Sequence, residues 1–546
     1  MSANRLSAVS LVLFLCTTSV IAQNIRITSV PPHGVWNGYL AGTVEGVGPS
    51  AYSVVVYIYV PGAGWYPKPY FSPVCTTIQP DSTWSALVTT GGADDEATIF
   101  AALLVPTTSC SDAGLLVEGD ECLPDRVNEV ALDSDYALRP NPDQRRVSFS
   151  GREWLVKSCV ERCGPGANYF SDSPDNVWVD TNGRLHLKIT YADAKWQCAE
   201  VICTQPLGYG TYLFNIESSV DDLDPNIVLG LFTYSEECQF ATGPCVDKHR
   251  EIDLEFARWG STTSPLNAQF VVQPYDCAGH RTQFTIPSGS SSHFFSWWPD
   301  VVQFQSEVGN TVQRWVFSNS AEIPLPNLEQ TRMNLWLLTS TTPTDAQERE
   351  VVISGFDYLR PLTNCSIPTM KAQADFTPVN TQGAAVSAAF DNFFYIEADN
   401  RACGIRVDKE DHGLSIGMRA DVTGTIQTNS DGERFISAAA AAQNGTGSVR
   451  PLGITNRGLE EGGLSTVGLL VTLWGRVTEI EQAASPTWFS INDGSAADIK
   501  CLVPDGVNID PDWDFVTVTG ASSCEMVSGG RLPLVRVRNQ DDIVSY

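Results

Sequence analysis

The stretch Glu251-Ile252-Asp253-Leu254-Glu255-Phe256 alternates acids with large apolar residues. Because successive side chains of a β-strand point to opposite faces, the three acids share one face and the three apolar residues share the other. The apolar face suits a buried core, whereas three carboxylates on one face repel one another and give the fold no stability. The pattern therefore predicts a half-buried strand whose acidic face lines a cleft that handles protons. A solvated acidic edge strand is the alternative, and the flanking apolar residues and Trp259 disfavour it.

The spacing of the two glutamates fits glycoside chemistry. Along a strand the Cα atoms of Glu251 and Glu255 lie about 13 Å apart, and side chains that lean inward bring their carboxyl groups closer together. A retaining glycosidase uses two carboxyl groups roughly 5–5.5 Å apart, one to attack the sugar carbon and one to protonate the leaving oxygen and then activate water. Asp253 lies between them and is expected to raise the pKa of its neighbours by like-charge repulsion.

Length and charge narrow the class of protein. A chain of 546 residues is too long for one core, so several domains are expected. The net charge of −29 argues against nucleic acid as a partner, because binding phosphates requires a basic face. A neutral polysaccharide is compatible with this charge.

The N-terminus predicts export. Arg5 precedes an apolar run from Leu6 to Cys16, and Val20-Ile21-Ala22 follows, which together are typical of a signal peptide over residues 1–22. No later run approaches the roughly 20 apolar residues that cross a bilayer. We expect a secreted, extracellular protein that is a monomer and has no membrane partner.

Cysteine usage points to the same compartment. Fourteen cysteines follow the signal segment, and an even number favours a set of disulfides whose connectivity the sequence leaves open. The close pairs Cys159/Cys163 and Cys198/Cys203 raise the alternative of zinc, which the secretory context and the lack of paired histidines disfavour.

Short β-type runs separated by Gly and Pro turns fill the chain, which predicts an all-β protein. We expect an N-terminal β-sandwich over residues 23–142 and two packed antiparallel sheets, a β-jelly roll, over 143–366. The clearest strands of the central part are 185–190, 210–216, 227–234, 252–256, 268–272, 301–304, 334–338 and 351–359.

Four aromatic residues of the N-terminal module allow two interpretations. Trp65, Tyr66, Tyr70 and Trp84 form either a sugar-stacking surface or ordinary core packing.

Two similar stretches follow, at 367–455 and 456–546. Each runs from an aromatic strand through a second strand and a long turn to Val-Thr-Gly, which predicts tandem small β-barrels. They resemble oligonucleotide/oligosaccharide-binding barrels. Residues 368–546 hold 13 Lys and Arg against 23 Asp and Glu, so nucleic-acid binding is not expected there.

The central segment resembles glycoside hydrolase family 16, the jelly-roll enzymes that cut β-linked glucans and galactans. The resemblance spans about 145–362 and centres on the acids of residues 251–256. Supporting pieces occur in family order, and they are Tyr209–Tyr212, Leu231–Tyr234, Gln269-Phe270, Phe295–Asp300 and Met333–Trp336.

The resemblance implies roles for individual residues. Glu251 would be the nucleophile, Glu255 the acid/base and Asp253 the assisting acid. The implied sugar contacts are Phe232, Tyr234, Asn334 and Trp336, where aromatic rings stack on pyranose faces and an amide bonds hydroxyls. No cofactor is required. The family often holds a calcium ion, but no ligand cluster in this sequence places one, and no metal ligand is assigned.

The sequence departs from lichenase-like members at three positions. They carry Trp at the position of His249, and Asn and Tyr at those of Val271 and Gln273. These differences leave the acids intact and leave the glucan linkage open.

The expected function is a secreted, polysaccharide-degrading β-glucanase. It would be a retaining endo-β-glycanase that hydrolyses internal β-1,3 or mixed β-1,3/1,4 bonds by double displacement. A transglycosylase of the same fold is one alternative, and no residue separates it from a hydrolase. A non-catalytic glycan-binding or adhesion protein is another, and it predicts loss of a catalytic acid, which has not occurred. A serine-hydrolase pattern, Gly413–Gly417, lacks a later histidine and is set aside.

Overall fold

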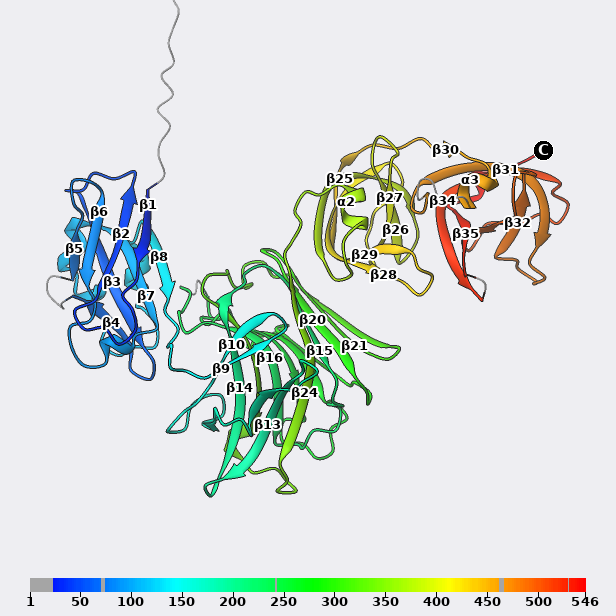
Figure 1. The fold of residues 1–546 in the computed structure, drawn as a ribbon. Coiled ribbons are helices and arrows are strands. Elements are labelled where there is room, and N and C mark those ends of the chain that lie inside the picture. Colours follow the sequence, from blue (N-terminus) through cyan, green and yellow to red (C-terminus); the bar gives the residue numbers. More distant parts are fainter. Residues whose placement is uncertain (1–22, 70–73, 241–242, 461–465, 529) are drawn as a thin grey trace, which may run out of the picture. The chain divides into compact units, whose positions relative to one another are not determined.

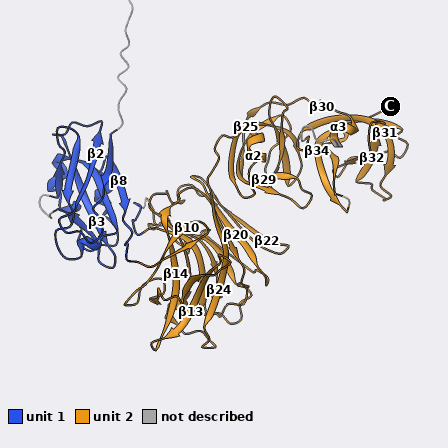
Figure 2. Cartoon of the chain, in the orientation of Figure 1, with its two compact units in different colours: residues 1–143, 236–240 blue, residues 144–235, 241–546 orange. Residues whose placement is uncertain are grey.

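The computed structural model describes residues 23–69, 74–240, 243–460, 466–528 and 530–546 (Figure 1). The described chain is almost entirely strand and divides into two compact units (Figure 2). Unit 1 holds the described residues up to Asp143 together with 236–240, and unit 2 holds the rest. The all-β prediction is confirmed. The expected signal peptide and Tyr70 lie outside the described residues.

Unit 1 is a β-sandwich of a three-stranded and a five-stranded sheet that enclose one apolar core. The first sheet has the order β1–β2–β6, and the second has the order β4–β3–β7–β8 with β5 beside β3. Its elements are β1 (Asn24–Ser29), β2 (Tyr39–Glu45), β3 (Tyr52–Val60), β4 (Gly64–Lys68), β5 (Cys75–Thr77), β6 (Thr83–Leu87), β7 (Ile99–Pro106), α1 (Asp125–Val130) and β8 (Asp133–Leu138).

The interpretation of Trp65 and Trp84 as part of a sugar-stacking surface is wrong. Trp65 and Trp84 are fully buried, and Trp84 belongs to the core between the sheets. Large indole rings are the most favourable side chains to bury there, so packing accounts for them.

Unit 2 begins with a large curved sheet that folds over on itself. Its path runs β19–β18–β17–β16–β23–β14 and then, through the β13–β14 hairpin, β13–β24–β15–β20–β21–β22. The elements of the first half and its neighbours are β9 (Arg146–Phe149), β10 (Arg152–Val156), β11 (Tyr169–Phe170), β14 (Lys195–Pro206), β16 (Ile227–Tyr234), β17 (Ile252–Phe256), β18 (Ala268–Val272), β19 (Arg281–Phe284) and β23 (Gln330–Leu337). Those of the second half are β12 (Val177–Val179), β13 (Leu185–Ala192), β15 (Gly210–Ile216), β20 (Ser291–Trp297), β21 (Val302–Val308), β22 (Thr311–Phe317) and β24 (Arg349–Leu359).

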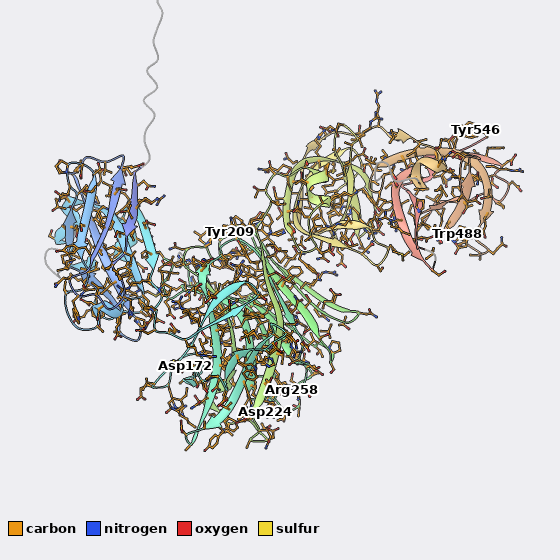
Figure 3. The ribbon with its side chains drawn as sticks, in the orientation of Figure 1. Asp172, Tyr209, Asp224, Arg258, Trp488 and Tyr546 are labelled. Carbon is orange, nitrogen blue, oxygen red and sulfur yellow. A yellow bond between two sulfur atoms is a disulfide. The ribbon has the colours of Figure 1, made fainter. Side chains whose placement is uncertain are left out.

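The core of this domain lies between the two halves of the sheet. Phe270 of β18 stacks on Phe304 of β21, with ring centroids 5.2 Å apart. Tyr209, labelled in Figure 3, packs edge-on against the buried Trp297. The packed aromatic interior is what the predicted pair of antiparallel sheets requires, and the eight strands that the sequence predicts for this domain are present.

Two five-stranded rings form the C-terminal part of unit 2. The first is a closed barrel of order β25–β26–β27–β29–β28, and the second reproduces that order, with β31 pairing both β32 and β34. In each ring one pair is parallel, β27 with β29 and β33 with β35. The elements are α2 (Ile367–Lys371), β25 (Pro378–Ala389), β26 (Phe393–Glu397), β27 (Gly404–Asp408), β28 (Met418–Thr428), β29 (Arg434–Thr446), β30 (Leu452–Gly453), α3 (Asn456–Glu460), β31 (Leu470–Ile480), β32 (Trp488–Asn492), β33 (Ile499–Leu502), β34 (Phe515–Val527), β35 (Gly530–Val537) and β36 (Ile543–Ser545).

The expectation that the fourteen cysteines after residue 22 form a full set of disulfides is wrong. Four disulfides form, and they are Cys75–Cys110, Cys122–Cys238, Cys159–Cys163 and Cys245–Cys277. Six further cysteines stay reduced within the described chain. Cys198 and Cys501, for example, are fully buried in separate cores, where a thiol packs as a small apolar group and has no partner thiol to pair with. Among the described residues, no helix has the length and apolarity needed to cross a membrane.

Candidate active site

The three acids of residues 251–256 lie on one face of β17, in the middle of the sheet. Strand β17 pairs with β16 on one side and with β18 on the other. Ile252, Leu254 and Phe256 pack into the core between the halves of the sheet. Glu251, Asp253 and Glu255 therefore point to the opposite surface, here called the acidic face.

Asp253 links the nucleophile candidate to its surroundings. It is only 2% exposed and shares a hydrogen bond between carboxyl groups with Glu251. That bond lowers the pKa of Glu251 and raises that of Asp253, which favours Asp253 as the hydrogen-bond donor of the pair. Gln273 Nε2 donates to Asp253 Oδ2 over 2.9 Å and holds the carboxyl group in place.

Glu255 has a separate set of partners. The amide of Gln269, directly opposite on β18, donates a hydrogen bond to Glu255 Oε2. Gln283 Nε2 on β19 in turn donates to Gln269 Oε1 over 3.2 Å, which fixes the direction of the Gln269 amide. A relay of two glutamines thus orients this carboxyl group from one side only.

The acidic face cannot ionise fully at neutral pH. Burial, with the charges of Asp247 and Glu255, raises the pKa of Glu251 to about 8. Burial raises the pKa of Asp253 well above its ordinary value, and the two glutamates add to the effect. Burial also raises the pKa of Glu255, while the Gln269 hydrogen bond and the charge of Arg281 oppose it. Such displaced pKa values suit groups that exchange protons with a substrate.

A tight turn delivers Glu251 to the start of β17. Arg250 has φ of 57°, and its Nε donates to the Leu325 carbonyl over 2.7 Å. Asp247 Oδ2 accepts the backbone N–H of Glu251 over 2.8 Å, and burial raises the pKa of Asp247. Asp247 is a residue that the sequence analysis missed, since its role depends on a turn that no local pattern announces.

The structure brings the four candidate sugar contacts onto the acidic face. Phe232 on β16 lies opposite Asp253, and Gly230 lies between Glu255 and Asn334. A Cβ at Gly230 would stand 2.6 Å from Asn334 Oδ1, so only glycine leaves room for the Asn334 side chain. Phe232 is 8% exposed and Asn334 is 2% exposed, so both form a buried part of the acidic face.

The other two candidate contacts, Tyr234 and Trp336, are more accessible. Tyr234 is held between two neighbours. His249 stacks on its ring at 4.7 Å between centroids, with an angle of 7° between ring planes. The Arg332 guanidinium lies 4.6 Å from the centre of the same ring.

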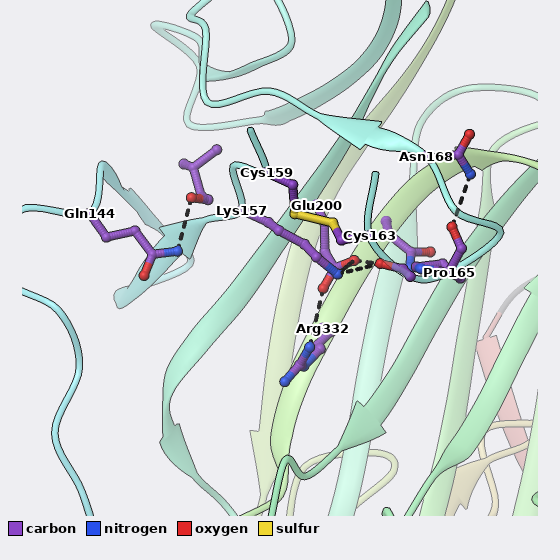
Figure 4. The surroundings of a disulfide bond; sticks show 11 residues. Gln144, Lys157, Cys159, Cys163, Pro165, Asn168, Glu200 and Arg332 are labelled. Carbon is purple, nitrogen blue, oxygen red and sulfur yellow. Dashed lines mark hydrogen bonds and ion pairs between the residues drawn. A yellow bond between two sulfur atoms is a disulfide. The ribbon is translucent and has the colours of Figure 1, made fainter. Parts of the chain in front are cut away.

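A buried charge network underlies this stack (Figure 4). Glu200 on β14 is fully buried, and its carboxylate accepts a hydrogen bond from Lys157 Nζ over 3.0 Å. Arg332 and Asn334 each approach its carboxylate to 3.4 Å. Glu200 and Arg332 were also missed, although each lies on a strand with readable alternation. Their partners come from strands distant in sequence.

Two clusters of metal-ligand type occur among the described residues, and neither is a metal site. In the first, Cys122 and Cys238 are bonded to each other, which leaves only His249 as a ligand. In the second, Cys245, His280 and Glu322 offer atoms within 4.8 Å of one another, but Cys245 is bonded to Cys277. A disulfide sulfur has no thiolate to give a metal.

Comparison with known proteins adds a likeness in structure only. No protein-family description matches the chain, and no curated protein is similar to it in sequence. A β-glucanase of Bacillus licheniformis aligns with 41% of this chain and 94% of its own, at 19% identity and a TM-score of 0.30. A laminarinase from Flavobacterium sp. UMI-01 aligns with 40% of this chain and 99% of its own, at 12% identity and a TM-score of 0.31.

A third solved structure is an immunostimulatory antigen and pseudo β-1,3-glucanase of Mycobacterium tuberculosis. It aligns with 39% of this chain and 90% of its own, at 19% identity and a TM-score of 0.29. Since these scores lie near 0.3 and the identities below 20%, the function must be argued from the geometry of the acidic face.

Proposed function

We propose that this protein is a retaining endo-β-glycanase that hydrolyses internal β-1,3 or mixed β-1,3/1,4 bonds of a β-glucan. The observation that carries the proposal is the arrangement of three carboxyl groups on one face. The central one, Asp253, is hydrogen-bonded to Glu251, and a separate amide, that of Gln269, is hydrogen-bonded to Glu255. A structural role does not account for three acids on one half-buried face, because their mutual repulsion opposes folding.

In the first step the ionised fraction of Glu251 attacks the anomeric carbon, and the bond to the leaving oxygen breaks as Glu255 gives that oxygen its proton. The raised pKa of Glu255 keeps this proton available. Asp253 donates its hydrogen bond to the Glu251 carboxylate and so holds one oxygen while the other attacks. The product is a glycosyl ester of Glu251 and a shortened chain with a free hydroxyl.

In the second step the roles of the acids reverse. Glu255, now a carboxylate, takes a proton from water, and the resulting hydroxide oxygen attacks the anomeric carbon. The ester bond breaks, and Glu251 leaves as a carboxylate that again accepts from Asp253. Two inversions at one carbon give overall retention, and no cofactor enters the balance.

The aromatic groups beside the acids support a sugar ring as substrate. Trp336 is partly exposed on the acidic face and is the aromatic side chain proposed to stack on a sugar ring. The ring of Tyr234 is covered by His249 and Arg332, so Tyr234 would line the site without stacking on a sugar face. The disulfides support an extracellular setting, where a polysaccharide is available.

The decisive experiment measures reducing-end release by the mature protein on barley β-glucan, laminarin, xyloglucan, agarose and carrageenan. Glu251→Gln is the matched control, because it keeps the shape and removes the nucleophilic charge. Release from one polymer with a fall in viscosity, abolished in the variant, supports the proposal. Wild-type turnover by Glu251→Gln would remove the assignment of the nucleophile. New products only on addition of an acceptor sugar would indicate the transglycosylase.

A further inference from the structure

A pocket of about 760 Å³ lies at one end of the jelly-roll domain, apart from the three acids. It is lined by the β13–β14 hairpin, the loop after Cys159 and the segment that follows β23, and we call it the hairpin pocket. Its lining includes Arg162, Tyr169, Tyr191, Lys195, Trp196 and Gln347. The volume falls in the range of pockets that bind small ligands, roughly 300–1,000 Å³.

Two aromatic rings are presented rigidly at the hairpin end. Tyr191 and Trp196 face each other across the β13–β14 pair, with ring centroids 5.2 Å apart and planes at 57°. Asp193 and Ala194 close the hairpin with φ of 52° and 59°, the signature of the tight turn that matches strand twist. Tyr191 is 55% exposed, although an aromatic side chain gains most by burial.

The pocket also contains two cationic hydrogen-bond donors, Arg162 from the loop after Cys159 and Lys195 from the hairpin itself. Arg162 and Lys195 lie over the ring of Tyr169, at 5.0 and 4.5 Å from its centre. Within the described parts of the chain neither cation forms an ion pair. Glu348, which also lines the pocket, forms its ion pair with Lys188, at 2.7 Å between Oε2 and Nζ. Arg162 Nη1 donates to the Ala167 carbonyl over 3.1 Å, and the remaining guanidinium donors and the Lys195 ammonium group are available to hydroxyl groups.

The loop that carries Arg162 is braced. Cys159 and Cys163 form a disulfide (Figure 4), and Asn168 Nδ2 donates to the Leu337 carbonyl over 2.8 Å. Gly166 of the same loop approaches the indole of Trp336 so closely that a Cβ there would lie 2.9 Å from Cζ3. Trp336 therefore packs against this loop, and neither Trp336 nor any of the three acids belongs to the lining of the hairpin pocket.

We propose that the hairpin pocket binds a short segment of a neutral glycan chain as a second, non-catalytic site. Sugar rings offer apolar C–H faces to Tyr191 and Trp196 and hydroxyl oxygens to Arg162 and Lys195. A polyanion is disfavoured because the chain as a whole carries a net charge of −29. The proposal rests on the proposed function only for the identity of the polymer, since the pocket contains none of the three acids.

The test measures binding without turnover. Affinity of Glu251→Gln for barley β-glucan and laminarin is compared with that of Glu251→Gln carrying Tyr191→Ala, Lys195→Gln or both. We expect the combined variant to bind polymer about tenfold more weakly, the loss of one good contact. Trp36→Ala is the control, since Trp36 is a similarly exposed aromatic, at 54%, in unit 1.

A second readout separates this site from the catalytic one. In the wild-type background, Tyr191→Ala with Lys195→Gln is expected to leave kcat/KM on a short chromogenic oligosaccharide unchanged and to lower it on polymer. Unchanged polymer affinity in a variant with an unchanged Tm overturns the proposal. An equal loss on short and long substrates also overturns it, because the pocket would then belong to the catalytic subsites. If no polymer is cleaved, the binding comparison still decides this proposal, while the proposed function fails by itself.

Discussion

Gln273 Nε2 donates a hydrogen bond to Asp253 Oδ2 over 2.9 Å, although the two residues are 20 positions apart in sequence. Gln273 follows β18 and its backbone N–H donates to the Glu251 carbonyl over 3.1 Å. One residue therefore holds both the backbone of Glu251, the proposed nucleophile, and the side chain of Asp253, the proposed assisting acid. This places the orientation of the acidic face under the control of the neighbouring strand.

Loss of that amide is expected to impair turnover. Gln273→Met keeps the length of the side chain and removes the donor, so Asp253 loses its orientation and its hydrogen bond to Glu251 is weakened. We expect kcat to fall about tenfold, the effect of one lost hydrogen bond to a charged or reacting group. Steady-state kinetics on the cleaved polymer measure it, with Gln313→Met on β22 as control. Equal kcat in both variants would contradict the role of Gln273.

Removal of the nucleophile is expected to stabilise the fold. Glu251 has a pKa of about 8 in the folded protein against its ordinary 4.5, so between these values the folded state holds a proton that the unfolded chain has released. The free energy of unfolding therefore falls as pH rises from 4.5 to 8. Glu251→Gln removes this dependence, and its Tm should exceed that of the wild type by about 10 °C at pH 8.

Thermal unfolding at pH 4 and pH 8 measures this difference. The gain in Tm should be small at pH 4, where Glu251 is protonated in both states. A gain that is the same at both pH values would show that burial of the Glu251 charge is not its source.

The absence of a side chain at Gly230 is expected to matter for catalysis. Gly230→Ala places a Cβ 2.6 Å from Asn334 Oδ1 and forces the Asn334 side chain to move. We expect kcat/KM to fall about tenfold, since one oriented polar contact to the sugar is lost. Gly355→Ala on β24 is the matched control, because the nearest atom to its added Cβ is 3.4 Å away. Similar activity in the two variants would remove Asn334 from the site.

Arg332 is expected to shift the pH dependence of Glu251, the proposed nucleophile. Its positive charge lowers the pKa of Glu251, so Arg332→Met should raise that pKa and shift the acidic limb of the kcat/KM profile to higher pH. Arg332→Lys keeps the charge and should shift the limb much less. Profiles of the three proteins measured at constant ionic strength test this. A limb that stays in place in Arg332→Met would show that the cation serves packing on Tyr234 alone.

Much of the architecture could be read from local pattern. The strands 210–216, 227–234, 252–256 and 268–272 were expected with the bounds that the structure gives them. Alternation is a property of one strand, and a half-buried sheet imposes it on every strand that it contains. The interpretation of Trp65 and Trp84 was left open and the full disulfide set was wrong, because burial and cysteine pairing depend on neighbours that a single strand does not specify.

The sequence by itself determined that Glu251, Asp253 and Glu255 share a face, since the period of a strand requires it. Only the tertiary structure decided what surrounds that face. Register across β14, β23, β16, β17 and β18 aligns Glu200, Asn334, Gly230, Glu255 and Gln269 in one row, from segments up to 134 residues apart. The physical reason is that side-chain direction is set by the local backbone, whereas hydrogen-bond partners and burial are set by which strands pair and in which register.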